Sequence, residues 1–428
     1  MFTRYTLFAW LIFFFLLPNL TAQTNTSSQT LLETIHFKGL KRTQENFLRQ
    51  FIHSKIGEPI TDSLLREDVQ MLKNISSLGN ANYRLDTSGQ KMQVTFEVEE
   101  VKTLLPILNF GGIEGNIWFQ VGFSDINWRG KGQFLSASYQ NTDGLHSGNI
   151  YYKVPQINGS NWGFSASLNK WSSREPLFFP EGTVNYDYDN NGIGLTAIRN
   201  FGIRRNIEIG GTYFIEEYEQ SALQFLEVVP GPDALRQPKW LAKLAYTENF
   251  LNYNTFYLEG LAWQILSQNV YNTLEKSWFH SLQLQMRYYN KPNDKGNFAA
   301  RLRIGIANND NTPFAPFVAD SYTNIRGIGN RIDRGTAQVV INAEYRRTLL
   351  ENKKWGAQAV VFSDTGTWRN PGGQLKDLVN PDQFRQFLGG GFRLIYNKVY
   401  GAVLRVDYGV DIFNPSERGI VIGLGQYF

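Results

Sequence analysis

The sequence predicts a mainly β protein, in which one small α+β domain precedes a sixteen-stranded antiparallel transmembrane β-barrel. Three observations lead to this fold class. Aromatic residues make up 14% of the chain and charged residues only 19%, a balance typical of many short strands. The chain begins with a short apolar run behind a basic residue. After about residue 100, polar and apolar residues alternate along one segment after another.

The composition excludes several kinds of site. The chain has no cysteine, which excludes disulfides, thiolate metal sites and a lipid-modified cysteine. The four histidines are far apart, and no two have the spacing of metal ligands; they are His36, His53, His146 and His280. The net charge of +4 is small and unclustered, which argues against nucleic acid as a partner. We therefore expect no metal, no cofactor and no nucleic-acid ligand.

The first 30 residues have the pattern of an export signal followed by a leader. Residues 1–22 contain Arg4, the apolar run Leu7–Leu17 and the small residue Ala22, as in a cleaved secretory signal peptide. The run is too short to cross a bilayer as a helix. Residues 23–30 form a polar leader. Because no later segment resembles a transmembrane helix, we expect the exported chain to enter a membrane only as a barrel.

Residues 31–100 are predicted to form the small α+β domain. A strand at 34–37 is followed by two helices and by two strands, at 81–85 and 92–98. We expect Thr43 and Thr61 to cap the helices, because each threonine precedes a run of apolar residues with helical spacing. The apolar residues of these runs are Phe47, Leu48, Phe51 and Ile52 in the first helix, and Leu65, Val69 and Leu72 in the second.

Residues 101–428 are predicted to form the barrel. Two faces are plain in the stretch 338–346, where Gln338, Asn342, Glu344 and Arg346 alternate with Val339, Ile341, Ala343 and Tyr345. The same alternation recurs at 282–288, 300–304 and 404–408. One face suits lipid and the other carries charge, as expected of a barrel with a wet interior. A soluble β-sandwich would also alternate, but the signal peptide and the aromatic strand ends favour a membrane barrel.

The strand count follows from the connections. Sixteen candidate strands begin near residues 104, 116, 132, 146, 161, 191, 206, 240, 254, 278, 297, 336, 355, 387, 400 and 419. Long connections are expected at 171–190, 218–239, 266–277, 307–335 and 365–386, with short ones such as 252–254, 290–296, 350–354 and 397–399 between them. With both ends of the barrel in the periplasm, every long connection lies outside and every short turn inside.

The two ends of the barrel predict a weak lateral seam between the first and last strands. Pro106 lacks the N–H group of a ladder hydrogen bond, so it belongs at an edge or a weakly paired position. Gly111 and Gly112 lie further along the same strand. The last strand is predicted to include Gly423 and to end on the aromatic residue Phe428. A rim proline without consequence is an equally good interpretation.

The longest well-bounded loop carries an arginine beside two glycines, and a later strand ends near a carboxylate. The residues of this motif are Arg326, Gly327, Gly329, Glu344, Asp364 and Gly366. The glycines let the backbone fold back, and an arginine fork can bind a carboxylate through two hydrogen bonds. Asp364 and Glu344 are expected to face the lumen, so we predict that Arg326 reaches Asp364 with Glu344 beside it. The alternative is an exposed loop arginine, worth about 1 kcal/mol at most.

These motifs resemble those of the BamA/TamA-type family of outer-membrane protein assembly and translocation barrels, the bacterial surface antigen barrels. Arg326-Gly-Ile-Gly329 is similar to the family's Arg-Gly-aromatic loop signature, with Ile328 at the aromatic position. Phe362-Ser-Asp-Thr-Gly366 is similar to its Phe-x-Asp-x-Gly signature on the thirteenth strand. The stretches 127–132, 389–393 and 404–408 also match, and residues 31–100 resemble a single POTRA domain. Phe428 resembles the family's C-terminal insertion signal, with Gln426 where a second aromatic is commoner.

The resemblance implies a protein of the bacterial outer membrane, with its N-terminal domain in the periplasm, that assembles, inserts or translocates other proteins. It implies unfolded outer-membrane or surface proteins as clients, with outer-membrane lipid and accessory lipoproteins as further partners. The POTRA-like domain would capture client strands and pass them to the seam. The alternatives are a two-partner-secretion-type exporter and a passive outer-membrane channel. The sequence has no nucleotide-binding loop and no Gly-x-Ser-x-Gly elbow, so we expect no enzymatic activity.

Overall fold

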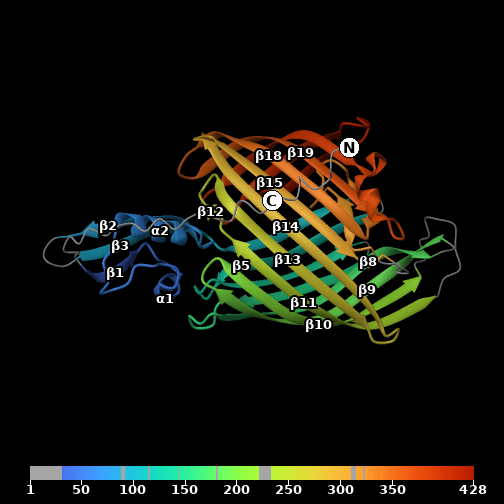
Figure 1. Cartoon of the computed structure of the whole chain (residues 1–428), viewed down its shortest axis with the longest axis horizontal. Helices are drawn as coiled ribbons and strands as arrows, with labels where there is room; N and C mark the ends of the chain where they lie inside the picture. Colours follow the sequence, from blue (N-terminus) through green and yellow to red (C-terminus); the bar gives the residue numbers. More distant parts are fainter. Residues whose placement is uncertain are drawn as a thin grey trace, which may run out of the picture.

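The computed structural model describes residues 31–87, 92–113, 116–142, 144–179, 182–220, 233–309, 315–321 and 323–428. They form a small α+β domain and a large β-barrel (Figure 1). The predicted signal peptide, residues 1–22, and the leader, residues 23–30, lie outside the described residues. Among the described residues, no helix combines the length and the apolar character needed to cross a membrane.

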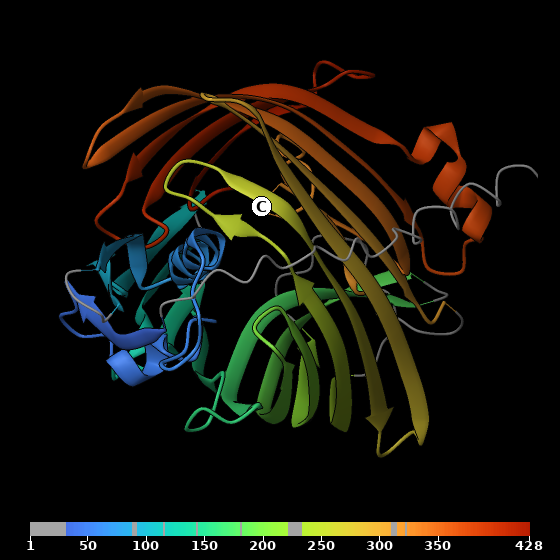
Figure 2. The same ribbon diagram turned by 60° about the vertical axis from the view of Figure 1, so that its left-hand side comes forward.

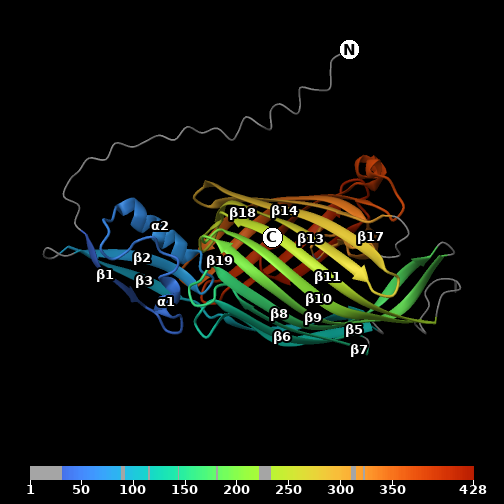
Figure 3. The same cartoon turned by 60° about the horizontal axis from the view of Figure 1, so that its bottom comes forward.

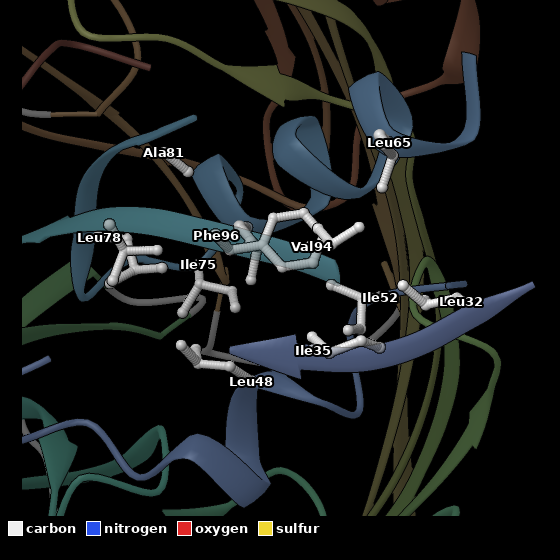
Figure 4. Close-up of a cluster of buried hydrophobic side chains, with 12 residues drawn as sticks. Leu32, Ile35, Leu48, Ile52, Leu65, Ile75, Leu78, Ala81, Val94 and Phe96 are labelled. Carbon is white, nitrogen blue, oxygen red and sulfur yellow. The ribbon is translucent and has the colours of Figure 1, made fainter. Parts of the chain in front are cut away.

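The small domain contains five elements around one apolar core. They are β1 (Leu32–Lys38), α1 (Glu45–Leu48), α2 (Asp62–Lys73), β2 (Leu78–Asp86) and β3 (Met92–Glu100). The sheet order is β1-β3-β2, with β1 parallel and β2 antiparallel to β3. Because β3 is central, its alternate residues Val94 and Phe96 lie in the middle of the core, as Figure 4 shows. β1 and β2 are left as the edge strands.

The predicted helix caps have opposite outcomes. Thr61 caps α2 as expected, because its hydroxyl accepts a hydrogen bond from a backbone N–H of the first turn at 3.2 Å. The prediction for α1 is wrong, since α1 begins at Glu45 and has only four residues. Thr43 instead accepts a hydrogen bond from Asn127 of the barrel at 2.9 Å. This partner is distant in sequence, so helical spacing gives no indication of it.

The barrel is one antiparallel sheet of seventeen strands, which follow one another in chain order and bring β22 next to β4. The strands are β4 (Leu104–Ile113), β5 (Asn116–Trp128), β6 (Gln133–Thr142), β7 (Leu145–Val154), β8 (Trp162–Phe179), β9 (Gly182–Phe201), β10 (Arg205–Gln220), β11 (Ala234–Asn249), β12 (Asn252–Tyr253), β13 (Leu258–Asn272), β14 (Ser277–Asn293), β15 (Gly296–Ala307), β18 (Ala337–Glu351), β19 (Trp355–Arg369), β20 (Arg385–Tyr396), β21 (Val403–Asp411) and β22 (Arg418–Leu424). β12 has only two residues. The other sixteen strands match the sixteen that the sequence predicts.

Two connections carry structure of their own. Between β15 and β18, the short strands β16 (Phe317–Asp320) and β17 (Asn330–Gly335) pair with each other. Between β19 and β20 lie two 3-10 helices, Leu375–Val379 and Pro381–Gln383. Figure 3 shows β17 near the end of the barrel opposite the small domain.

The predicted long connections are shorter than expected, because several strands extend further. β9 begins at Gly182 and β11 at Ala234, earlier than predicted. The expected loop at 171–190 is mostly a paired ladder, which runs from Trp171 opposite Asn190 to Phe179 opposite Gly182. The backbone pairing of β8 with β9 therefore continues well beyond the predicted strand ends.

The two faces of the barrel wall differ in chemistry. On β18, Gln338, Asn342 and Glu344 are at most 2% exposed and face the interior, while Ile341 is 50% exposed on the outer face. Large apolar side chains project outward from the other strands in the same way, among them Leu195, Ile209, Val361 and Ile420. The barrel therefore has an apolar exterior and a polar, charged interior.

Candidate functional site

The connection between β15 and β18 folds back into the barrel and places Arg326 against the inner wall. The Arg326 guanidinium donates to both carboxylate oxygens of Asp364, from Nε at 2.8 Å and from Nη2 at 2.9 Å. Its Nη1 donates to Glu344 Oε2 at 2.5 Å. Asp364 lies on β19 and Glu344 on the neighbouring β18, so one arginine joins the loop to two strands. The structure thus brings together the three charged residues of the motif.

This arginine clasp, defined as Arg326 with Glu344 and Asp364, is shielded from solvent. Arg326 and Asp364 are both 0% exposed. The guanidinium carbon lies 3.7 Å from the ring centre of Phe362 and 4.4 Å from that of Tyr427. Buried charges of opposite sign in bidentate contact, with aromatic faces against the cation, hold a fixed geometry that an exposed pair does not.

Two glycines shape the tip of the loop. Gly327 has φ +99° and Gly329 has φ +85°, a conformation that disfavours side chains with a Cβ atom. The Gly329 N–H donates to the Ser321 hydroxyl at 2.6 Å, and the Ser321 N–H donates to the Gly329 carbonyl at 3.0 Å. A Cβ atom on Gly327 would lie only 2.7 Å from the Gly409 carbonyl oxygen, so the tip packs directly against β21.

Glycines on the opposing wall make room for this tip. A Cβ atom on Gly409 of β21 would lie 2.3 Å from the Arg326 carbonyl oxygen, and one on Gly419 of β22 would lie 2.8 Å from the Gly327 carbonyl oxygen. The loop therefore contacts β18, β19 and the last two barrel strands at once. Sequence reasoning missed Gly409 and Gly419, because a glycine in a strand gives no sign of which distant backbone it approaches.

Apolar residues of the loop pack beside the clasp. Ile325 and Ile328 are buried in a cluster with Val340, Trp368 and Phe387 of the wall, among others. Ile328 occupies the motif position where an aromatic residue is usual, and it remains only 6% exposed there. Gly366 leaves space for this packing, because a Cβ atom at that position would meet the Trp368 ring at 2.5 Å and Ile325 at 2.9 Å.

A second layer of polar groups surrounds the clasp. Asn342 donates to Asp364 Oδ1 at 2.8 Å and to the Asn324 carbonyl at 2.7 Å. Arg346 pairs with Glu344 at 2.5 Å, and Arg393 pairs with Asp407 at 2.6 Å. Every buried carboxylate of this cluster therefore has an arginine partner, which is the arrangement that buried charges require.

The predicted course of the last strand is wrong beyond Leu424. β22 ends there, Gly425 has φ +87°, and the final residues turn into the barrel. The Tyr427 hydroxyl donates to the Ser321 carbonyl at 3.2 Å, and Arg346 donates to the Phe428 carbonyl at 3.0 Å. Phe428 thus contributes to the interior rather than to the seam.

Gln426 has a specific place in this inward turn. Its side-chain amide donates to Gln358 at 3.4 Å and accepts from Arg393 at 3.2 Å. A phenylalanine at this position could make neither contact. The departure from the family pattern at Gln426 therefore accompanies the inward turn of the chain.

The remaining seam residues lie on the strands expected for them. Pro106 is in β4 opposite Phe123, and the β4 backbone positions 111 and 112, both glycine, are opposite positions 118 and 117 of β5. Gly423 is in β22 opposite Arg405, where a Cβ atom would lie 2.9 Å from the Arg405 guanidinium. Phe428 lies in the barrel interior, so the prediction that it belongs to the seam is wrong.

The small domain is docked on the barrel through contacts that the sequence does not reveal. Arg42 donates to the buried Asp125 at 2.6 Å, and the Gln44 N–H donates to the Gly130 carbonyl at 2.8 Å. Glu99 forms an ion pair with Lys398, which lies in the turn between β20 and β21. The stretch 127–132, which carries part of the family pattern, is therefore a docking site for the small domain.

Among the described residues, no group of three or more histidine, aspartate or glutamate side chains is arranged to hold a metal ion. The features above define the class of structure. It is a β-barrel with an N-terminal α+β domain and a loop clasped to the inner wall by arginine.

Comparison with known proteins places this fold. No protein-family model matches the sequence, and a search of curated proteins finds no match. BamA from Haemophilus ducreyi lacking POTRA domains 1–3 is similar in structure, with a TM-score of 0.55 and 14% identity over 93% of this chain and 84% of that one. CdiB from Acinetobacter baumannii has a TM-score of 0.55 and 14% identity over 93% of this chain and 74% of that one. CdiB from Escherichia coli has a TM-score of 0.52 and 8% identity over 95% of this chain and 92% of that one. The chain therefore has the fold of the BamA and CdiB barrels, as its motifs led us to expect.

Proposed function

We propose that this protein is an outer-membrane factor that inserts or translocates other proteins, and that it belongs to the BamA/TamA-type family. The observation that carries the proposal is the buried arginine clasp, which joins a barrel loop to β18 and β19. The tip of the same loop packs against β21 and β22. A passive pore has no need for a loop braced against its last strands. The similarity of fold to BamA and CdiB supports the same reading.

The chemistry of the surface supports an outer-membrane location. The exterior is apolar and the interior is charged, which suits a barrel wall in lipid. The N-terminal export signal supports passage into the periplasm. With both ends of the barrel on the periplasmic side, the small, POTRA-like domain of residues 31–100 lies in the periplasm.

The small domain has an edge that fits an extended client. β2 pairs with β3 on one side only, so the N–H and C=O groups of its other edge are available for strand addition. Main-chain hydrogen bonds of this kind give affinity without demanding a particular sequence. We assign β2 as the first binding surface for unfolded outer-membrane or surface proteins.

The junction between β4 and β22 is the proposed exit seam. β22 has only seven residues, whereas β9 on the far wall has twenty. Pro106 has no N–H group, so β4 offers one backbone donor fewer to its neighbouring strands. An opened junction exposes a free strand edge on which a client strand can pair. The clasped loop, seated against β22, holds the wall in register during that exchange.

Depletion of the protein, followed by a census of outer-membrane and surface proteins, tests this proposal. Loss of integral barrel proteins supports insertion, and loss of exported surface proteins with intact barrels supports translocation. An unchanged census, together with a large steady conductance, would instead favour a passive channel. Complementation with Arg326→Ala separates the clasp from the mere presence of a barrel, because we expect that variant to restore the census only in part.

A further inference from the structure

The outer surface of the barrel has a hollow over strands β5 to β9. Its lining includes Ile150 and Leu168, which are 50% and 51% exposed and belong to the apolar outer face. The hollow has a volume of about 700 Å³, within the range of about 300–1,000 Å³ that is usual for ligand sites. On the outside of a membrane barrel, a hollow of this kind is open to lipid.

Two small residues create the hollow. Ala137 of β6 lies opposite Phe123 of β5, and both face outward. Gly148 of β7 lies between Tyr139 of β6 and Lys170 of β8, on the same face of the wall. The outer surface is therefore recessed between longer side chains. The recess belongs to paired strands, so its shape does not depend on a loop.

The two ends of the hollow differ in chemistry. The small domain marks one end of this wall, since the Gln44 N–H donates to the Gly130 carbonyl between β5 and β6, and Figure 2 shows the domain, in blue, beside the teal strands. The turn between β6 and β7 lies at the other end. Near that turn, the Tyr139 hydroxyl and His146 Nδ1 share a hydrogen bond of 2.7 Å. Apolar side chains such as Phe123 lie nearer the small domain. A lipid has the same polarity, with a polar headgroup at one end and an apolar chain at the other.

Lys170 supplies a positive charge to the hollow. It faces outward, because it lies two residues after Leu168 on β8 and directly opposite Gly148 of β7. Its side chain is exposed, and no carboxylate of the described residues forms an ion pair with it. By contrast, Lys153 faces the lumen and pairs with Glu208 at 2.8 Å. A charge on the lipid-facing surface is costly unless it lies near the interface, where it can meet a headgroup.

The headgroup rather than the chain decides which lipid this hollow favours. The surrounding lipid chains are as apolar as the wall, so a chain gains only closer packing in the recess. A phosphate next to an ammonium group gains an ion pair that a neutral lipid lacks. Asn191 of β9 lies directly opposite Lys170 and adds an amide donor on the same face. The charge of the hollow therefore complements an anionic headgroup.

We propose that this hollow binds one phosphate-bearing lipid of the outer leaflet, with the phosphate at Lys170 and Asn191 and an acyl chain over Gly148 and Ala137. The leaflet named rests on the proposed function, which puts the small domain in the periplasm and so the polar end of the hollow on the outside. The bound lipid would hold the wall from β5 to β9 at a fixed depth in the membrane.

Native mass spectrometry of the purified full chain, titrated with lipid A in detergent, tests the site. The wild type should bind one molecule, and Lys170→Gln should weaken binding roughly 5-fold, as loss of one charge at a membrane surface gives. Lipid A without its phosphates should bind the wild type and Lys170→Gln equally. Lys276→Gln is the matched control and should bind like the wild type, because Lys276 is an exposed lysine at the same end of the barrel, between β13 and β14.

Filling the hollow provides an independent perturbation. A Cβ atom on Gly148 has its nearest contact at 3.6 Å, with the Ser138 carbonyl oxygen, so Gly148→Leu fills the recess without a clash in the wall. Gly211→Leu is the matched control, because Gly211 lies on the outer face of β10 opposite Leu195, and its nearest contact would be at 3.7 Å. Gly148→Leu should abolish the binding of lipid A, and Gly211→Leu should leave it unchanged.

Three results would each overturn the site. They are equal binding by Gly148→Leu and Gly211→Leu, unchanged affinity in Lys170→Gln, and equal affinity of the wild type for lipid A with and without its phosphates. The titration contains no client, so its failure leaves the depletion census, and hence the proposed function, standing. An unchanged census together with intact lipid A binding would contradict the proposed function alone.

Discussion

Replacement of Arg326 by alanine should destabilise the barrel more than loss of any surface ion pair. The substitution removes two side-chain hydrogen bonds from Asp364, which keeps only Asn342 at 2.8 Å and the backbone N–H of residue 326 at 3.0 Å. Asp364 is 0% exposed, so its charge is then buried without a cationic partner in contact. Breaking a buried pair in this way costs about 3–5 kcal/mol.

The stranded charge should be Asp364 rather than Glu344. Glu344 still contacts Arg346 at 2.5 Å after Arg326 is removed. Addition of Asp364→Asn to Arg326→Ala therefore removes the uncompensated charge, and the double variant should recover about 1–3 kcal/mol relative to the single one. A smaller loss of unfolding free energy in the double variant than in Arg326→Ala would show that Arg326 and Asp364 interact directly.

Urea unfolding of the folded barrel in lipid vesicles measures these free energies. Arg236→Ala is the matched control, because Arg236 forms an exposed pair with Glu217 and its loss should cost less than about 1 kcal/mol. Protease sensitivity of the loop between β15 and β18 gives an independent readout. The reasoning fails if Arg326→Ala behaves like Arg236→Ala, or if Asp364→Asn adds a further loss to it.

Three further predictions concern the loop tip, the inward turn and the small domain. Gly327→Ala places a Cβ atom 2.7 Å from the Gly409 carbonyl oxygen, on a residue whose φ is +99°. The backbone conformation alone should cost about 1–2 kcal/mol, so the loop should become sensitive to protease. An unchanged digestion pattern would contradict the close packing of the loop tip against β21. Tyr427→Phe should cost about 1 kcal/mol by loss of the hydrogen bond to the Ser321 carbonyl, and Tyr427→Ala about 3–5 kcal/mol in urea unfolding; equal losses would show that the ring contributes nothing. Burial alone would raise the pKa of Glu100, but backbone N–H groups of residues 41–43 bind its carboxylate and lower that pKa. The stabilisation is therefore present above the ordinary pKa of about 4.3 and lost as the pH falls through the lower folded value, and Glu100→Gln should remove this pH dependence from hydrogen exchange of the small domain.

The number and order of the barrel strands could be predicted because each strand separates an apolar exterior from a charged interior. This separation imposes a period of two on the sequence, as in residues 338–346, where Glu344 is buried and Ile341 is exposed. The strand ends could not be predicted in the same way. The β8–β9 hairpin from Trp171 to Asn190 is held by backbone pairing, which is independent of which side chains alternate.

Contacts between residues distant in sequence account for the other errors. Thr43 has the local features of a helix cap, but its hydroxyl binds Asn127 of the barrel. Phe428 follows an apolar strand pattern, yet its carbonyl accepts from Arg346 and its ring packs beside Tyr289. The inward turn depends on arginines from several other strands, and no local pattern encodes them.

The clasp itself could be predicted from the sequence, because its chemistry is specific. An arginine beside two glycines in a long loop, with a lumen-facing carboxylate on a later strand, leaves few other partners for the charge. The geometry joins Arg326 to Asp364 and Glu344. The glycines that receive the loop tip, Gly409 and Gly419, have no such signature, since the atoms they accommodate are backbone atoms of the loop.

The most direct test of the proposed function is reconstitution of the purified full chain into lipid vesicles with an unfolded outer-membrane barrel protein as client. The rate at which the client becomes folded and protease-resistant should be higher than in empty vesicles. Vesicles that contain Arg326→Ala should give a rate between these two. A client that folds equally fast in empty vesicles, or equally fast with both forms of the protein, would contradict an assembly role that depends on the clasp.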